Sequence, residues 1–172
     1  MNDPSPRRIH RQDYAPPPFL VDEVELDIHF NSGEVLVDSH LHLRRNPAAA
    51  AGQALQLDGH GLETLSLAID GTPLATGEYT CSDCRLSIAN PPDALTLSTR
   101  VRVDADHNTS LCGLYRSKDG YFTQCEAQGF RRITWFPDRP DIMSRYLVTL
   151  HADKSSLPVL LANGNPVANG DE

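Results

Sequence analysis

Apolar and polar residues alternate along most of this 172-residue chain with a period of two, which is typical of β-strands with one buried face. The most regular run covers 95–103, where leucine, threonine and valine alternate with polar and basic side chains. Runs at 24–30 and 35–44 flank the turn residues Asn31-Ser32-Gly33 and predict a β-hairpin. Shorter strands are predicted at 55–57, 65–69, 78–81, 85–89, 111–116, 121–126, 146–151 and 158–162.

Helical patterns are almost absent from the sequence. No segment keeps a helical period over three turns, and only 140–144 is typical of a single helical turn. The alanine-rich stretch 46–53 is predicted to be a loop. Turn signals recur at short intervals, and the chain has 13 prolines and 11 glycines. These features predict an all-β fold, a saddle-like antiparallel β-sandwich with little helix.

The length of the chain is sufficient for one domain with its own hydrophobic core. Residues 1–20 are predicted to form an irregular N-terminal arm, because Pro16-Pro17-Pro18 stiffens the approach to the first strand. Residues 21–172 are predicted to form a single β-sandwich domain. Its last segment, 163–170, consists of turn-forming residues, so we expect the final strands of the domain to be missing.

Charge and hydropathy narrow the choice of partner. The net charge of −8 argues against nucleic acid, because phosphate binding needs a basic face. No apolar run is long enough to cross a membrane, and no signal-peptide pattern is visible. We therefore expect a cytoplasmic protein without a membrane partner, in which the four cysteines are reduced thiols.

Those cysteines are the first candidates for a metal site. Cys81-x-x-Cys84, together with Cys112 and Cys125, could supply four thiolates to zinc, but the second half lacks the second C-x-x-C that makes such a pattern specific. We expect buried or incidental thiols instead, since free cysteine usually behaves as a small core residue.

The histidines and the familiar catalytic motifs add no further candidate. His40 and His42 share one face of a predicted strand, but no third ligand is evident, and both are expected to face solvent. The chain contains no H-E-x-x-H, no G-x-S-x-G and no phosphate-binding glycine loop. The sequence thus predicts neither a metal site nor a catalytic residue in this chain.

The most informative segment is 122–140, FTQCEAQGFRRITWFPDRP, which combines Gln124, Glu126 and several arginines with a Trp-Phe-Pro turn. Dense polar segments between strands are where recognition residues usually lie. The residues alone leave two interpretations open. Glu126 recognises a ligand, or it pairs with Arg131 or Arg132 and only pins a loop.

This segment resembles the signature of the N-terminal domain of M1-family zinc aminopeptidases, in particular the bacterial aminopeptidase N type. The resemblance is densest at 113–115, 123–131 and 138–141, and it continues to 161–165. It implies a saddle-like β-sandwich packed on a catalytic domain that carries H-E-x-x-H and zinc. That domain lies outside this chain, so the isolated chain is expected not to hydrolyse peptides.

The resemblance also implies roles for two residues. Glu126 would bind the free α-amine of a peptide substrate, and Gln124 would line the pocket for the first side chain. The implied partners are peptides with a free N-terminus and the catalytic domain of the same polypeptide. Two alternatives remain at this point: a stand-alone β-sandwich module that binds a peptide or protein, and a structural domain whose loop docks on its neighbour.

Overall fold

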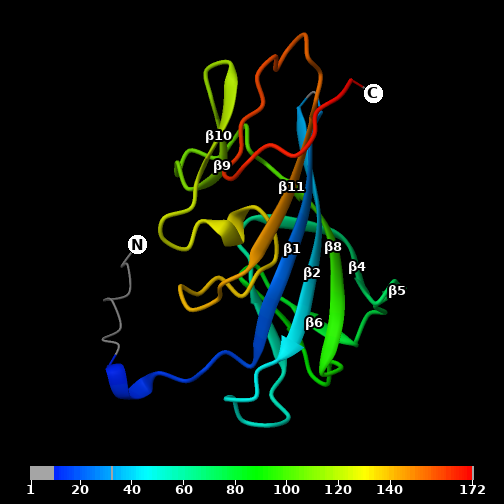
Figure 1. Cartoon of the computed structure of the whole chain (residues 1–172), viewed down its shortest axis with the longest axis vertical. Coiled ribbons are helices and arrows are strands. Elements are labelled where there is room, and N and C mark those ends of the chain that lie inside the picture. The colour runs from blue at the N-terminus through cyan, green and yellow to red at the C-terminus, as the bar shows by residue number, and fades with distance from the viewer. Residues whose placement is uncertain (1–9, 32, 172) are drawn as a thin grey trace.

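The computed structural model describes residues 10–31 and 33–171, and its main element is a six-stranded sheet with the order β11-β1-β2-β8-β4-β5 (Figure 1). The fold also contains a three-stranded sheet with the order β3-β7-β6 and a separate β9–β10 hairpin. The strands are β1 Phe19–Asn31, β2 Glu34–Arg45, β3 Leu55–Asp58, β4 Leu62–Ile69, β5 Thr72–Pro73, β6 Tyr79–Cys81, β7 Arg85–Ile88, β8 Ala94–Val103, β9 Gly113–Ser117, β10 Gly120–Gln124 and β11 Arg145–Ala152.

The hairpin predicted from the first two long runs is confirmed. β1 and β2 pair antiparallel from Phe19↔Arg45 to Asn31↔Glu34. Their burial alternates as the sequence pattern requires, so that one face of the pair is dry. β8 lies between β2 and β4 and shows the same alternation, which confirms the prediction for 95–103.

The two sheets share one hydrophobic core, as expected for a β-sandwich. The strands predicted at 78–81 and 85–89 are confirmed as β6 and β7, which pair antiparallel, and β3 pairs with β7. The buried core side chains include Val24, Val37, Leu41, Leu97 and Val101 from the six-stranded sheet and Leu55, Leu57, Leu86 and Ile88 from the three-stranded sheet. The predicted all-β class is therefore confirmed, with one exception to the antiparallel pattern: β11 pairs parallel with β1.

Three local predictions were wrong. In the strand predicted at 65–69, a period of two puts Leu65 on the buried face with Leu67. Leu65 is instead 41% exposed, because the register shifts between Thr64 and Ser66 and such a bulge inverts the alternation. Residues 158–162 form no strand, and they have no partner strand among the described residues to satisfy their backbone groups. Residues 140–144 form no helical turn: the Ile142 N–H bonds to the Arg139 carbonyl and closes a simple turn before the chain extends into β11.

Helical structure is limited to two 3-10 turns in the described part of the chain, η1 (Arg11–Asp13) and η2 (Phe130–Arg132). No helix there is long and apolar enough to cross a bilayer. Of the predicted N-terminal arm, residues 1–9 lie outside the described residues, and the rest is η1 followed by an extended segment that leads into β1.

A buried cluster of hydroxyl groups attaches the segment after η2 to the main sheet. Thr134 Oγ1 donates to Ser39 Oγ over 3.1 Å, and Thr99 Oγ1 lies 3.1 Å from Ser39 and 3.3 Å from Thr134. All three side chains are buried, and each hydroxyl satisfies the others. The central strands β2 and β8 therefore fix the position of the segment that follows η2.

Candidate functional site

Residues 124–129, here called the Gln-Cys-Glu loop, connect β10 with η2. Both predicted site residues lie in it: Gln124 ends β10, and Glu126 is exposed on the turn that follows. The Gln124 side-chain amide donates a hydrogen bond to the Glu126 carbonyl over 3.3 Å, and the Glu126–Ala127 peptide bond is cis. The fold thus brings Gln124 and Glu126 together on one exposed turn.

The Glu126 carboxylate has no hydrogen-bonding or ion-pair partner among the described residues. The interpretation that it pairs with Arg131 is wrong, because Arg131 bonds to Asp138 and Asp58 instead. Arg132 forms no ion pair with it either within the described chain. Glu126 is therefore an exposed acceptor whose oxygens are open to a cationic group.

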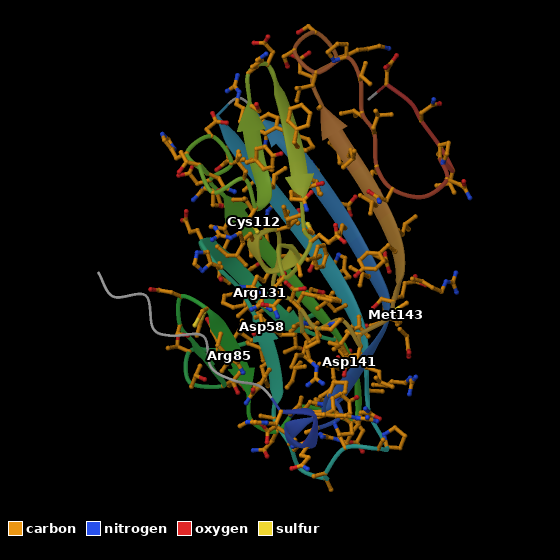
Figure 2. All side chains as sticks on the ribbon, turned by 90° about the vertical axis from the view of Figure 1, so that its left-hand side faces the viewer. Asp58, Arg85, Cys112, Arg131, Asp141 and Met143 are labelled. Atoms are coloured by element: carbon orange, nitrogen blue, oxygen red, sulfur yellow. The ribbon has the colours of Figure 1, made fainter. Side chains whose placement is uncertain are left out.

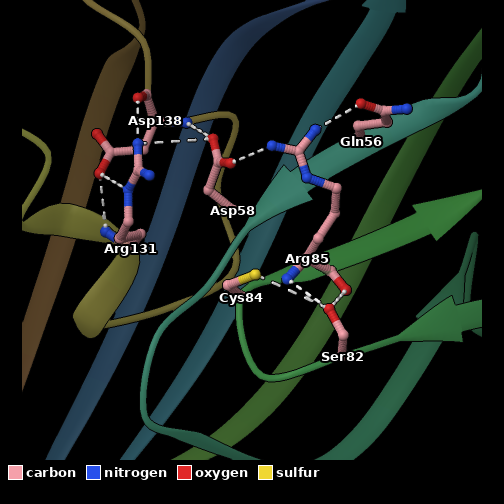
Figure 3. Close-up of polar contacts among 7 residues, drawn as sticks. All are labelled: Gln56, Asp58, Ser82, Cys84, Arg85, Arg131 and Asp138. Carbon is pink, nitrogen blue, oxygen red and sulfur yellow. Dashed lines mark hydrogen bonds and ion pairs between the residues drawn. The ribbon is translucent and has the colours of Figure 1, made fainter. Parts of the chain in front are cut away.

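The arginine that follows the loop is fixed by Asp138 (Figure 3). The Arg131 backbone N–H and Nε donate to the same oxygen, Oδ2, over 3.1 and 3.0 Å, and Nη2 donates to the Asp138 carbonyl over 2.9 Å. Both side chains are largely buried, with 25% and 14% exposed. Such charge-assisted bonds are stronger than neutral ones, so η2 is held rigidly beside the loop.

Asp58, at the end of β3, connects this pair to the second sheet. Its Oδ2 lies 3.7 Å from Arg131 Nη2 and accepts the Asp138 N–H over 3.3 Å, while Oδ1 accepts from Arg85 Nη2 over 3.2 Å (Figure 3). Backbone bonds between Asp58 and Phe136 run in both directions. The Asp58 carboxylate thus joins β3, β7 and the segment after η2 into one polar network.

Glycines allow the close packing around this network. A Cβ on Gly59 would lie 2.2 Å from the Trp135 ring, which is buried and donates Nε1–H to Thr64 over 2.8 Å. A Cβ on Gly129 would lie 2.5 Å from the Gln124 carbonyl oxygen and 2.6 Å from Cys125 Cα. Only hydrogen fits at these positions, so both glycines are required by contact and not by backbone conformation.

A second ionic contact attaches the N-terminal segment near the same region. Arg139 donates to both carboxylate oxygens of Asp141, over 2.8 and 2.6 Å, and to the Ala15 carbonyl over 2.9 Å. Tyr14 Oη donates to Asp141 over 3.1 Å. Hydrogen bonds from Arg139, and then from Tyr14, hold the pKa of the Asp141 carboxyl below its ordinary value.

The four cysteines do not assemble into a thiolate site. Cys81 and Cys84 are exposed at the β6–β7 turn, and Cys112 and Cys125 lie at the base of the β9–β10 hairpin. Figure 2 places Arg131 and Asp58 between Cys112 and Arg85, the first residue of β7. No group of three or more cysteines forms among the described residues. Burial raises the pKa of the Cys125 thiol to about 11, with smaller contributions from Asp138 and Cys112.

The two histidines of β2 lie on the sheet face that points away from the core. His42 Nε2 is 2.8 Å from Glu25 Oε1, and the ligand atoms of Glu23, Glu25 and His42 lie within 4.8 Å of one another. Sequence reasoning missed these carboxylates because strand register, and not spacing along β2, brings them beside His42. Tyr146 is in register with buried Val24. It therefore lies on the core-facing side of the sheet, opposite to the face that carries Glu23, Glu25 and His42.

Phe130 packs edge-on against Tyr146, with ring centroids 5.9 Å apart, and against Phe136 at 4.9 Å. The Gln-Cys-Glu loop therefore leads into the core-facing side of β11, away from the Glu23, Glu25 and His42 group. The loop presents an unpaired carboxylate and an amide on a rigid support, an arrangement suited to binding a cationic ligand. Asp58 and Asp138 build that support. In the sequence, the only signals for them were that Asp58 directly follows a predicted strand and that Asp138 begins the segment 138–141, which resembles the family.

Comparison with known proteins agrees with this architecture. A model of the peptidase M1 N-terminal domain family matches residues 22–172. Aminopeptidase N of Caulobacter vibrioides is 45% identical over 170 residues, 99% of this chain and 19% of that protein, and aminopeptidase N of Escherichia coli is 35% identical over 166 residues, 96% of this chain and 19% of that protein.

A crystal structure of Legionella pneumophila aminopeptidase A in complex with aspartic acid is similar at 30% sequence identity with a TM-score of 0.84. The match covers 89% of this chain and 18% of that one. The chain thus spans about a fifth of the length of each of these relatives.

Proposed function

The chain belongs to the peptidase M1 N-terminal domain family, and from this we propose that it serves an aminopeptidase N by binding the free α-amine of peptide substrates through Glu126. The observation that carries the proposal is the unpaired, exposed carboxylate of Glu126 on a loop that the rest of the fold holds in place. A carboxylate that served to pin the loop through an ion pair would have a cationic partner within the domain, and the nearby Arg131 bonds to Asp138 and Asp58 instead.

The chemistry of the amine supports this role. A peptide α-amine has a pKa of about 8 and is largely protonated at neutral pH. A carboxylate directed at it forms a charge-assisted hydrogen bond, which is strengthened where water is excluded. Fixing the amine also fixes the first peptide bond relative to the reacting groups, so removal of single N-terminal residues follows from geometry.

The support of the loop suits such a task, because a binding group that is already positioned loses little entropy when the ligand arrives. Gly129 packs against the start of the loop, and Arg131 with Asp138 fixes its end. Gln124 donates its amide N–H to the Glu126 carbonyl, which leaves its amide oxygen directed elsewhere. We propose that Gln124 lines the pocket for the first side chain of the substrate.

The family implies zinc, but the residues of this chain do not fit a family zinc site. The sequence contains no H-E-x-x-H. The one group of three possible ligands among the described residues, on β1 and β2, lies on the face of the sheet away from the Gln-Cys-Glu loop. We propose that another part of the polypeptide holds the metal, which would polarise the scissile carbonyl when bound, and that this chain alone does not hydrolyse peptides.

The four cysteines are all free thiols, which is usual in reducing compartments, and we propose a cytoplasmic location on that ground.

The test of the proposed function uses the complete enzyme and alanyl-p-nitroanilide. Glu126→Gln should lower kcat/KM by at least about 100-fold, the equivalent of losing one partner of a desolvated ion pair. Glu78→Gln is the control for removal of an exposed carboxylate, one that accepts the Ala75 N–H in the turn before β6, and it should leave kcat/KM unchanged. Equal activity of the wild type and Glu126→Gln would refute the proposal. Peptide binding by the isolated chain would instead favour a stand-alone binding module.

A further inference from the structure

Two cysteines lie close together at the base of the β9–β10 hairpin. Ser117 pairs with Gly120 across a two-residue turn, and the ladder ends at Gly113↔Gln124. The pair that flanks a two-residue turn is hydrogen-bonded, and hydrogen-bonded and non-hydrogen-bonded pairs then alternate. Cys112 and Cys125 lie one residue beyond the Gly113↔Gln124 pair, just outside the ladder, where Gly113 turns the chain with a φ of 76°. The next pair in a regular ladder would be non-hydrogen-bonded, with Cα atoms about 4.5 Å apart, and residues close to that position are within the range that a disulfide can span.

Side-chain packing gives independent support for this proximity. A carbon added at Gly129 would lie 2.6 Å from Cys125 Cα and 3.2 Å from Cys112 Sγ, so one methyl group would touch both cysteines. Figure 2 shows Cys112 at the base of the hairpin. Both cysteines are free and only half-buried, which leaves them accessible to a small oxidant.

The backbone of each cysteine is also held in place. Asn108 Nδ2 donates to the carbonyls of Cys112 and Leu114, over 2.8 and 2.9 Å. The Gly129 N–H donates to the Cys125 carbonyl over 2.9 Å. These backbone hydrogen bonds therefore hold the two cysteines near each other in the folded chain.

We propose that Cys112 and Cys125 form a site of reversible oxidation, at which a low-molecular-weight disulfide converts the two thiols to a cross-strand disulfide at the base of the hairpin. The Cys112 thiolate attacks the oxidant disulfide and releases one small thiol. Cys125 then loses its proton to solvent, attacks the Cys112 sulfur and releases the second small thiol. The two protein thiols lose two electrons and two protons, and the oxidant gains them.

The order of these steps follows from burial. Burial raises the pKa of the Cys125 thiol to about 11, so little thiolate is present at this residue at neutral pH. Closure of the disulfide should accordingly be the slow step, and its rate should rise with pH up to that value. The product would tie Cys125, the residue before Glu126, to Cys112, the residue before β9, whether or not Glu126 binds a substrate amine.

The experiment uses the complete polypeptide with Cys81→Ser and Cys84→Ser, since these exposed cysteines could react on their own. After treatment with oxidised glutathione, tryptic digestion and mass spectrometry should find peptides 103–116 and 119–131 linked to each other, and dithiothreitol should release them. The same background with Cys112→Ser is the matched control and should give no link within the chain.

Two results would overturn the proposal. One is glutathione attached to Cys112 and Cys125 of the same molecule, which would show that the two sulfurs do not reach each other. The other is full recovery of both peptides as free thiols at a pH above 9, where wild-type Cys125 should already react. Neither result depends on enzyme activity, so failure here is distinguishable from failure of the proposed amine-binding role.

Discussion

Arg131 donates to Asp138 through both its Nε and its backbone N–H, and the two bonds converge on one carboxylate oxygen over 3.0 and 3.1 Å. This contact closes the segment after the Gln-Cys-Glu loop on itself. It also uses the cation that Glu126 would otherwise approach, so Glu126 remains unpaired. The fold thus separates a structural ion pair from a carboxylate that is open to a ligand.

The Arg131 and Asp138 pair should contribute measurably to stability. Arg131→Met would leave Asp138 and Asp58, whose side chains are 14% and 17% exposed, without their shared cation. We expect the free energy of unfolding, measured by urea denaturation, to fall by about 2–3 kcal/mol. Arg44→Met is the control, because its partner Asp22 is 54% exposed, and it should cost less than about 1 kcal/mol. Equal losses would mean that Arg131 is no better placed than a surface arginine.

The glycine after the loop offers a steric test of how rigidly the loop is held. Gly129→Ala would push a methyl group against the Gln124 carbonyl and Cys125 Cα, which are backbone atoms and can move only with the loop. We expect a loss of about 1–3 kcal/mol in thermal unfolding, as for other overpacked sites.

A matched control exists at Gly120, the first residue of β10. A methyl group at Gly120 would meet only the Phe122 ring, at 3.3 Å, and that exposed side chain can turn away. Gly120→Ala should therefore leave the melting temperature nearly unchanged. A variant of Gly129 that melts like the Gly120 variant would contradict the close packing described for the loop.

The Asp141 carboxyl predicts a specific acid dependence. Its pKa is lowered in the folded state, chiefly by Arg139, so the carboxylate contributes stability above the unfolded pKa of about 3.9. That contribution is lost as the pH falls through the lower folded-state pKa. Asp141→Asn should therefore reduce stability at neutral pH and flatten the decline on acidification, as followed by urea denaturation across the acidic range. An unchanged acid slope in Asp141→Asn would show that another carboxylate is responsible.

Most of the strands could be predicted because one face of each is buried and the alternation records it. The alternation of apolar and polar residues gives a wrong prediction where burial depends on which strands lie beside a segment, because the alternation does not specify the neighbouring strands. Leu65 is exposed by a bulge, and 158–162 has an apolar composition but no strand beside it in the described chain. The parallel pairing of β11 with β1 was equally out of reach, since a period of two does not reveal strand direction.

The candidate site shows the same division. Gln124 and Glu126 came from a resemblance, and the structure adds that Glu126 is unpaired. The partners of Arg131 could not be read from spacing, because Asp58 reaches it from another sheet. Because Glu126 is close to Arg131 along the chain, the sequence suggested an ion pair between them. In the folded chain Arg131 pairs with Asp138 instead.

The most direct measurement of the central claim is the coupling between Glu126 and the substrate amine. In the complete enzyme, binding of a peptide-like inhibitor with a free α-amine would be compared with that of its analogue in which hydrogen replaces the amine. The wild type should favour the free-amine inhibitor by at least about 100-fold, and Glu126→Gln should lose most of this preference. If Glu126→Gln retains the wild-type preference, the carboxylate does not bind the amine, and the proposed function is wrong.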